Sequence, residues 1–431
     1  MTVSIPHSMM LLAFLIRQGT FWKIIKLFAR YHLSGYQKRP VSLERGLQSI
    51  RSNKNTPPEI NIQKPIDIVI PVYNGYIYLA NLFDSIFRNT DLSFRLIIVE
   101  DCSSDPLVLP FLQKIHADHP DSILLIQNRT NSGFAESVNI GVRHTSGHFV
   151  ILNTDVEVPP NWLSRLMAPI FSGNRIASTT PFSNAADILS FPEFPGKNPI
   201  FAGLCLTELD EYFQYVKSGS PWIEVPSGVG FCMGVNRHAV EQIGMFDKET
   251  FGLGYCEEND WCMRAKKAGF KNIMVPNLFV YHKQGASFED KQKKQLLRKN
   301  YWCLVKRHKE FLPTLYKFTA VDPLRPIREI LVLIISATSG TSTKRINFFI
   351  GPKNNERCLK YQNKQYELVF TFDKLSTLQE LFEHISTSEI NLHFMQGFPE
   401  QAQIEKIAKA AFLEAGNEKD LNPAGFRAAS E

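Results

Sequence analysis

The sequence of 431 residues contains no long hydrophobic run. No window approaches the about 20 consecutive apolar residues that a membrane-spanning helix needs. The longest early run, residues 9–16, ends at Arg17 and lacks the preceding basic residues of a secretory signal. The composition, 44% hydrophobic and 21% charged, excludes a disordered or collagen-like chain. We therefore expect a folded protein without a transmembrane helix or a cleaved signal.

Closely paired cysteines are also lacking. The seven cysteines are an odd number, and no two of them have the C-x-x-C spacing of a zinc site or a thioredoxin-like redox site. In cytoplasmic proteins, scattered single cysteines typically stay reduced and serve as small apolar side chains. We therefore expect a cytoplasmic protein without disulfides.

Acidic residues are scarce at the start of the chain. Residues 1–64 contain ten Lys and Arg but only two acids, a local charge of +8, so the rest of the chain carries about −2. This distribution predicts a basic leader before a near-neutral body, and it does not favour binding to nucleic acid. Residues 20–32 have the pattern of an amphipathic helix, and residues 51–65 that of a linker. The helix could lie on the inner face of the membrane, or dock on the next domain with its charges in water.

Apolar strands alternate with helical patterns over the next ninety residues. Strands are expected at residues 66–71, 94–99, 122–127 and 148–153, with a helix between each pair. This alternation predicts an α/β domain, in which a mostly parallel sheet is covered by helices on both faces. Ligands of such sheets bind beyond the carboxyl ends of the strands. Neither G-x-G-x-x-G after the first strand nor a P-loop motif is present, which disfavours dinucleotide dehydrogenases and P-loop enzymes.

Two carboxylates follow the fourth expected strand. Asp155 and Glu157 would repel each other, and such pairs are commonly bridged by a divalent cation, Mg²⁺ or Mn²⁺. A cation there would also neutralise a diphosphate. In the alternative interpretation, Asp155 caps the next helix and Glu157 faces water.

A second acidic cluster contains Glu257, Glu258 and Asp260, after a glycine-containing loop and at the expected start of a helix. These acids could simply complement the helix dipole. Alternatively, partial burial could raise the pKa of one of them enough for it to act as a general base. His282 follows the apolar stretch 274–280, and a lone histidine at the end of a strand is either structural or a ligand.

Several motifs occur in a fixed order over residues 66–290. They include Ile68-Val69-Ile70-Pro71-Val72-Tyr73-Asn74, Val99-Glu100-Asp101-Cys102-Ser103, Asn131-Ser132-Gly133-Phe134, Leu152-Asn153-Thr154-Asp155-Val156-Glu157, Gly254-Tyr255-Cys256-Glu257-Glu258-Asn259-Asp260 and His282. In this order they resemble family 2 glycosyltransferases of the GT-A fold, particularly the rhamnosyltransferase-like branch that acts on cell-surface polysaccharides. The resemblance covers about half of the chain.

The resemblance implies roles for individual residues. The residues implied to bind the nucleotide sugar are Pro71, Tyr73, Glu100, Asp101, Asn131 and Asn153. The implied ligands of the divalent cation are Asp155, Glu157 and His282. Glu258 stands at the position of the catalytic base. Because the family usually has an aspartate there, Glu257 and Asp260 remain alternatives.

The implied reaction is a metal-dependent, inverting transfer in cell-surface polysaccharide biosynthesis. A sugar would pass from a UDP-, dTDP- or GDP-linked donor to a saccharide or lipid-linked saccharide, in the cytoplasm or at the inner face of the membrane. Loops within residues 181–230 would set the specificity. The alternatives are a catalytically silent protein that binds a sugar nucleotide or a partner, and a nucleotidyltransferase.

The glycosyltransferase domain is expected to span residues 65–295. The basic helical segment 296–328 would brace the sheet or cover the acceptor site. Strands at 330–335, 346–350, 367–372 and 390–394, with helices at 375–385 and 400–414, predict a small α/β unit at 329–415. Residues 390–399 faintly resemble the start of a GT-B domain. Residues 416–431 are predicted to be disordered.

Overall fold

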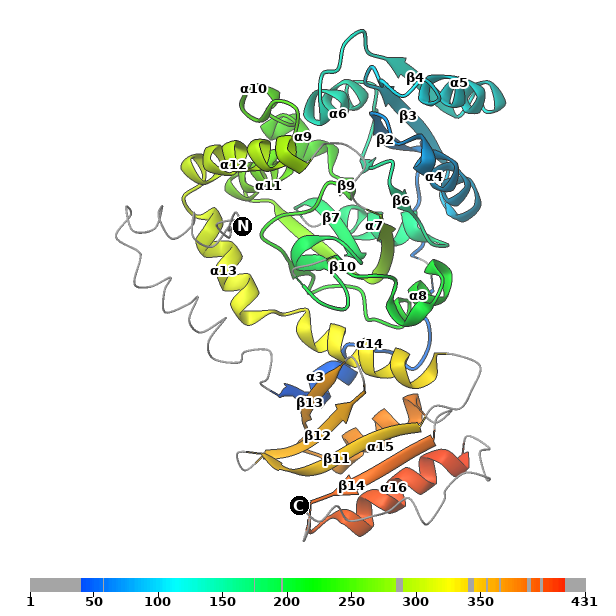
Figure 1. The fold of residues 1–431 in the computed structure, drawn as a ribbon, viewed down its shortest axis with the longest axis vertical. Coiled ribbons are helices and arrows are strands. Elements are labelled where there is room, and N and C mark those ends of the chain that lie inside the picture. The colour runs from blue at the N-terminus through cyan, green and yellow to red at the C-terminus, as the bar shows by residue number, and fades with distance from the viewer. Residues whose placement is uncertain are drawn as a thin grey trace. The chain divides into compact units, whose positions relative to one another are not determined.

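The computed structural model describes residues 40–414, except 57, 174, 195–196, 284–289, 340–344, 354–355, 364–365, 386–388 and 396–397. The expected leader helix at 20–32 and the expected tail at 416–431 lie outside these residues. The chain divides into two compact units (Figure 1). The larger contains residues 45–315 and 323–344, and the smaller contains the described residues of 1–44, 316–322 and 345–431. Among the described helices, none has the length and apolar character needed to cross a bilayer.

Four parallel strands begin the sheet of the larger unit, and three of them, at 66–72, 94–100 and 149–152, have apolar runs that are mostly buried on both faces. The strands are β2 (Ile66–Val72), β3 (Phe94–Glu100), β4 (Ile123–Gln127) and β5 (Phe149–Leu152). The connecting helices are α4 (Tyr76–Asn89), α5 (Val108–Asp118) and α6 (Phe134–Val142). Helix α6 lies close to the sheet at Gly141, where a Cβ atom would collide with Val69.

Five further strands complete this sheet. They are β6 (Val156–Glu157), β7 (Ile176–Ser183), β8 (Ile223–Glu224), β9 (Cys232–Val235) and β10 (Lys271–His282). The strand order is β4-β3-β2-β5-β9-β7-β10-β6, with β8 paired to β10. In the described part of the chain, β6, β8 and β9 run opposite to the other six strands. The predicted α/β class with a mostly parallel sheet is therefore confirmed.

Helices cover both faces of this sheet. Gly234 of β9 packs against Met167 and Ile170 of α7 (Trp162–Phe171), whereas Met233 and Val235 join a core with α6 on the opposite face. The other helices that the structure describes before residue 270 are α3 (Leu43–Gln48), η2 (Asp187–Leu189), η3 (Phe201–Gly203), α8 (Leu206–Phe213), α9 (Arg237–Ile243), α10 (Lys248–Phe251) and α11 (Glu257–Lys267).

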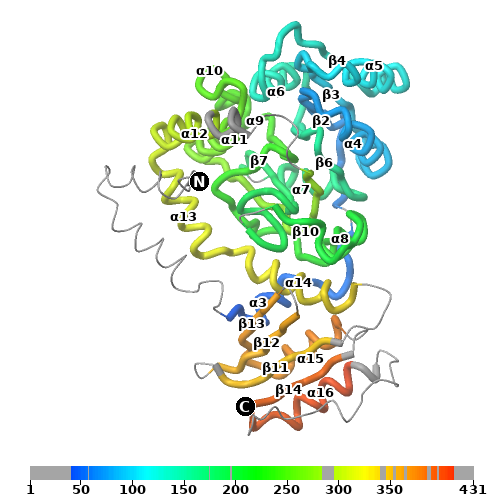
Figure 2. The backbone as a smooth tube through the Cα atoms, viewed as in Figure 1, coloured from blue at the N-terminus to red at the C-terminus, as the bar shows by residue number. Residues whose placement is uncertain are grey.

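Three helices follow the last strand of the larger sheet: α12 (Asp290–Arg307), α13 (Phe311–Val321) and α14 (Arg325–Thr338). Figure 2 traces them along the backbone. Residues 330–335, predicted to form a strand, belong to α14, and this prediction was wrong. Ile330, Leu333 and Ile335 are completely buried. A short run that is apolar on every side has no period that distinguishes a buried helix from a buried strand.

The smaller unit contains a five-stranded sheet. Its strands are β1 (Val41–Ser42), β11 (Arg345–Lys353), β12 (Glu356–Gln362), β13 (Glu367–Thr371) and β14 (Glu389–Phe394), in the order β1-β13-β12-β11-β14. Its helices are α15 (Leu375–His384) and α16 (Gln401–Glu414). The predicted strands near 346, 367 and 390 and both predicted helices are confirmed. Strand β12 was not predicted, because Arg357 and Lys360 interrupt its apolar residues.

Candidate active site

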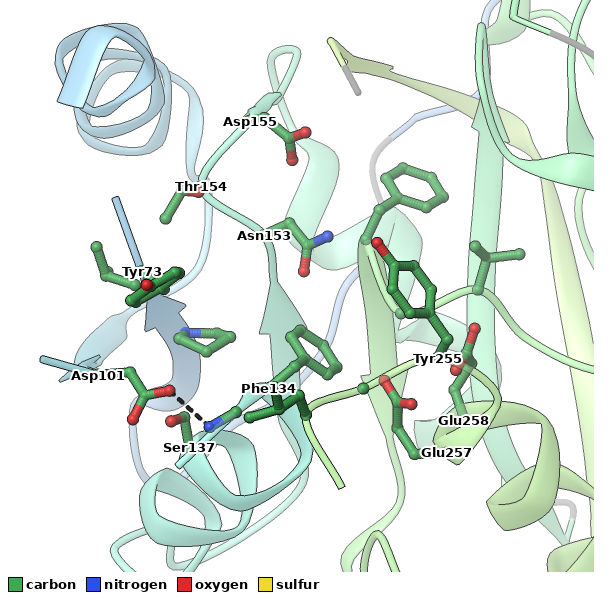
Figure 3. A pocket seen from close by; sticks show the side chains of 18 of the residues that line it. Tyr73, Asp101, Phe134, Ser137, Asn153, Thr154, Asp155, Tyr255, Glu257 and Glu258 are labelled. Carbon is green, nitrogen blue, oxygen red and sulfur yellow. Dashed lines mark hydrogen bonds between the residues drawn. The ribbon is translucent and has the colours of Figure 1, made fainter. Parts of the chain in front are cut away.

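A cavity of about 460 Å³ opens beyond the carboxyl ends of β2, β3 and β5 (Figure 3). Three strand ends thus meet at one place, as is general for open α/β sheets. Nine of the predicted site residues line it: Pro71, Tyr73, Asp101, Asn131, Asn153, Asp155, Glu257, Glu258 and His282. Glu100, Glu157 and Asp260 are not among the lining residues.

Asp101 joins the end of β3 to the loop that precedes α6. Its carboxylate accepts hydrogen bonds from the backbone N–H groups of Ser132 and Gly133, both at 2.8 Å, and from Nδ2 of Asn128 at 2.7 Å. The side chain therefore shapes the loop that carries Asn131 while it still lines the cavity.

Glu100 has a different position from the one implied by the resemblance. Its carboxylate accepts hydrogen bonds from the backbone N–H groups of Ser103 at 2.6 Å and Cys102 at 3.3 Å. The residue is buried, and Cys102 has a left-handed backbone with φ 57°. Glu100 therefore stabilises a tight turn beside the cavity and is not among the residues that line it.

Asp155 and His282 come together because β6 pairs with β10, with Val156 opposite His282. Nε2 of His282 lies 3.4 Å from Oδ1 of Asp155. The imidazole Nδ1 lies 2.8 Å from the carbonyl oxygen of Ala185, and the ring stacks on Phe231. Burial works to raise the pKa of Asp155, but the interaction with His282, a hydrogen bond from the backbone and the charge of Lys197 together lower it. The Asp155 carboxylate is therefore ionised at neutral pH.

These donors suit a divalent cation. A carbonyl oxygen can only accept, so the bond to Ala185 requires a proton on Nδ1 of His282. Nε2 points at Asp155, and a divalent cation bound between the two would take the place of the Nε2 proton, leaving a nitrogen lone pair and a carboxylate oxygen as its ligands. Oδ1 of Asn153, which lines the same cavity, is buried and has no hydrogen-bond partner among the described residues. No cluster of three or more His, Cys, Asp and Glu is found in the described structure, so waters or a ligand would complete the coordination.

Glu157 does not line the cavity with Asp155, and its carboxylate has other partners. Its Oε1 lies 2.9 Å from Nζ of Lys283 and accepts a hydrogen bond of 3.0 Å from Nδ2 of Asn81. Asp155 belongs to the turn before β6 and Glu157 to the strand itself. Residues two apart point to the same face only when both belong to a strand, so the spacing of Asp155 and Glu157 does not place their carboxylates on one side.

Glu257 and Glu258 begin α11 at the other side of the cavity. Glu257 is 4% exposed, and its Oε2 has no partner in the described structure. Burial, together with the negative charge of Glu258, raises the pKa of Glu257 well above its usual value. Burial, with a contribution from Asp187, raises the pKa of Glu258 to about 7. Both acids therefore hold a proton more tightly than an ordinary glutamate, and Glu258 titrates close to neutral pH.

An unusual backbone presents these two acids. Tyr255 and Cys256 both have left-handed conformations, with φ 72° and 73°, which are uncommon for residues other than glycine. Nδ2 of Asn300, on α12, donates hydrogen bonds to the carbonyls of Phe251 and Gly254, both at 2.7 Å, and of Tyr255 at 3.1 Å. The sequence analysis missed Asn300, because a single asparagine within a helix carries no signal of such a role.

Asp260 does not line the cavity, and its carboxylate is held by two arginines and a histidine. Its carboxylate lies 2.7 Å from Nε of Arg264, 3.0 Å from Nη1 of Arg307 and 2.8 Å from Nε2 of His308. Burial alone would raise the pKa of Asp260, but these hydrogen bonds lower it to about 2. These contacts, and its absence from the cavity lining, make Asp260 a poorer candidate for the base than Glu258.

Further residues line the cavity to which the sequence analysis assigned no role. They are chiefly Phe134, Asp187, Lys197, Phe231, Tyr255 and Leu297. Asp187 and Lys197 lie in the segment 181–230, which was predicted to set specificity, but nothing in the sequence distinguished them from neighbouring polar residues.

The comparisons with known proteins agree with this geometry. The family model "Glycosyl transferase family 2" matches residues 67–244, which run from β2 through β9 and α9. The chain contains a family 2 glycosyltransferase domain. The resemblance to family 2 glycosyltransferases is thereby confirmed, and the mostly parallel α/β sheet agrees with the GT-A fold that this resemblance implies.

Curated relatives of the family 2 domain are also glycosyltransferases. An uncharacterized glycosyltransferase of Haemophilus influenzae is 31% identical over 21% of this chain and 29% of its own length. The uncharacterized glycosyltransferase YwdF of Bacillus subtilis is 26% identical over 47% of this chain and 68% of its own. The matches to the first three relatives cover 29%, 35% and 43% of the lengths of those relatives, so the chain spans less than half of each. A solved mannosyltransferase of Pyrobaculum calidifontis, in complex with GDP-Man and Mn²⁺, is 15% identical with a TM-score of 0.46, over 74% of this chain and 87% of its own.

Proposed function

We propose that this chain transfers a sugar from a nucleotide diphosphate to a hydroxyl of a saccharide or lipid-linked saccharide, with inversion at the anomeric carbon. One observation carries the proposal. The cavity of the family 2 domain is lined by the Asp155–His282 pair and also by Glu258, whose pKa is raised to about 7. In the view of Figure 3, Asn153 and Asp155 lie between Tyr73 and Asp101 on one side and Glu257 and Glu258 on the other.

The two sides of the cavity suit the two substrates. Tyr73, Asp101 and Asn131 line the side formed by β2, β3 and the loop before α6, and we assign the nucleotide to it. Asp155, His282 and Asn153 would hold Mg²⁺ or Mn²⁺ on the diphosphate, and the bound cation would neutralise its negative charge. Glu258 is left for the acceptor.

The residues of the chain account for the reaction. The Glu258 carboxylate takes the proton of the acceptor hydroxyl, and the oxygen attacks the anomeric carbon as the bond to the diphosphate breaks on the opposite face. A single displacement of this kind inverts the anomeric centre. A base with a pKa near the operating pH is well matched to this task, and such assistance contributes about 10²–10⁴-fold in rate. No covalent nucleophile is required.

The test is release of nucleoside diphosphate from a panel of UDP-, dTDP- and GDP-linked sugars. The purified full chain is incubated with each donor and Mn²⁺, with and without EDTA. We expect release from one nucleotide class, abolished by EDTA and strongly reduced in Glu258→Gln. Binding of a donor without turnover under any condition would support the silent binding protein instead.

We further propose a role in cell-surface polysaccharide synthesis at the inner face of the membrane, through the basic leader. Because Val41 and Ser42 pair with β13, a truncation that tests the leader should end before them. Removal of residues 1–39 is expected to weaken sedimentation with anionic vesicles and to leave donor hydrolysis unchanged. Full sedimentation of the truncated chain would contradict this role. The rhamnosyltransferase-like branch and the GT-B resemblance at 390–399 stay predictions.

A further inference from the structure

The cavity contains many more acids than bases. Its lining includes the carboxyl groups of five residues: Asp101, Asp155, Asp187, Glu257 and Glu258. Among the described residues that line it, Lys197 is the only lysine or arginine. A sugar nucleotide brings two further negative charges on its diphosphate, and a third develops as the sugar leaves. Such a ligand needs compensating positive charge beside it.

Two asparagines hold the segment that carries Lys197. The backbone N–H and the Nδ2 of Asn198 donate to the carbonyl of Asn184, at 2.9 and 3.2 Å. In return, Nδ2 of Asn184 donates to the carbonyl of Asn198 at 3.2 Å. These three hydrogen bonds, which we call the asparagine clasp, join residue 184 to residue 198.

The asparagine clasp is attached to the strand that carries His282. Oδ1 of Asn184 accepts a hydrogen bond of 2.8 Å from the backbone N–H of His282, and its Nδ2 donates to the carbonyl of the same residue at 3.0 Å. Asn184 is buried. Asn184 therefore binds both the backbone of His282 and the segment that carries Lys197. The positive charge of Lys197 also contributes to the lowered pKa of Asp155, which agrees with this placement.

We propose that Lys197, positioned by the asparagine clasp, binds the diphosphate of the donor and neutralises the charge that grows on it as the sugar leaves. This inference rests on the proposed transferase function and adds a residue to its donor site. The atoms balance without a new reagent. The acceptor proton goes to Glu258, and the nucleoside diphosphate departs with the electron pair of its bond to the anomeric carbon. Lys197 remains an ammonium ion throughout.

The decisive measurement compares a nucleoside diphosphate with its nucleoside. The full chain is titrated, in the presence of Mn²⁺, with three nucleoside diphosphates: UDP, dTDP and GDP. It is also titrated with the matching nucleosides: uridine, thymidine and guanosine. Calorimetry measures binding of the diphosphates, and ligand-observed NMR measures binding of the nucleosides. For the diphosphate that binds, Lys197→Gln is expected to raise Kd about tenfold, as for loss of one charge-assisted hydrogen bond. Nucleoside binding is expected to be unchanged, and Lys197→Arg to retain most of the affinity.

Lys283→Gln is the matched control. This lysine follows His282 directly, but its Nζ pairs with Glu157 at 2.9 Å and it does not line the cavity. It is expected to leave the affinity for the diphosphate unchanged. An equal loss in both lysine variants would overturn the proposal, because a general electrostatic effect would then explain it. So would a loss for the nucleoside as large as for the diphosphate.

The outcomes separate this inference from the proposed function. If wild-type protein binds none of the three diphosphates, both are overturned. If it binds one and Lys197→Gln binds it equally well, only the role of Lys197 is overturned.

A double-mutant cycle tests the asparagine clasp. Asn198→Ala removes the Nδ2 hydrogen bond to Asn184 but leaves the lysine in the chain. It is expected to weaken diphosphate binding severalfold alone, and to add little in the Lys197→Gln background. Equal losses in both backgrounds would show that Asn198 does not act through Lys197. Thermal melts of each variant confirm that the comparison is made on folded protein.

Discussion

Nε2 of His282 lies 3.4 Å from Oδ1 of Asp155, although the two residues are far apart in the sequence. The antiparallel pairing of β6 with β10 brings them together. The hydrogen bond from Nδ1 to Ala185 and the stacking on Phe231 hold the imidazole in one orientation. Two donors of the kind that a divalent cation prefers are therefore oriented before any ligand arrives.

We predict that Asp155→Asn and His282→Gln each weaken the activation of donor hydrolysis by Mn²⁺, raising the half-saturating Mn²⁺ concentration by about 10–100-fold. The reason is the loss of one of the few protein donors in the site. Glu157→Gln is the control, because Glu157 pairs with Lys283 outside the cavity. The prediction fails if Glu157→Gln has the larger effect, or if EDTA leaves the wild-type rate unchanged.

Catalysis should depend on pH through Glu258. Its pKa is raised to about 7, and only the ionised form accepts a proton. We therefore expect kcat/KM to fall about tenfold per pH unit below pH 7 and to level off above it. In Glu258→Gln this dependence should disappear, together with 10²–10⁴-fold of the rate. A pH profile of the glutamine variant that still shows the acid limb would assign the base to another group.

Asp187→Asn should move the acid limb of the same profile to lower pH. The negative charge of Asp187 helps to raise the pKa of Glu258, so removing this charge favours the ionised carboxylate. We expect the midpoint of kcat/KM to shift below that of the wild type. A shift to higher pH would contradict the geometry of the cavity.

Asn300 is expected to act as a positioning residue. Replacing it with Ala leaves the carbonyls of Phe251, Gly254 and Tyr255 without their shared donor. The strained backbone before Glu257 should then relax, and kcat should fall at least tenfold, while binding of the nucleoside diphosphate changes little. The acid limb should also broaden or shift. Lys299→Ala, at an exposed position of the same helix, is the control and should behave as wild type.

Asp260 should affect stability rather than chemistry. Its folded pKa of about 2, against an ordinary value of 3.8, corresponds to about 2 kcal/mol of folding free energy at neutral pH. Because the pKa is lowered on folding, this contribution is present above pH 4 and is lost as the pH falls toward 2. We expect Asp260→Asn to lower the melting temperature at pH 7 and to differ less from wild type at pH 3. An unchanged melting temperature at pH 7 would contradict this role.

The strands and helices from β2 to β5 could be predicted because each carries a local signal. The strands are short apolar runs that end in turn residues, and the helices have apolar positions at helical spacing. The same logic failed at Ile330, where an apolar run is equally compatible with both structures until its surroundings are known. It also failed at β12, whose charged side chains hide the alternation.

The candidate site also divides into what could and what could not be predicted. Asp155, Glu258 and His282, which line the cavity, could be selected from the sequence through the ordered motifs that resemble family 2 glycosyltransferases. Nothing local separated Asp155 from Glu157, or Glu258 from Asp260, since all are acids near the end of a strand or the start of a helix. Their different roles come from partners elsewhere in the chain, Lys283 for Glu157 and His308 for Asp260.

The sequence alone determined the α/β class, the family and the segments that supply the candidate site, because apolar periodicity and ordered motifs are local properties. Only the tertiary structure decided which acids share a cavity, which of them have a raised pKa, and that Asn300 and Lys197 belong beside them. Burial, charge pairing and hydrogen-bond partners depend on contacts between distant segments, and these exist only once the chain has folded.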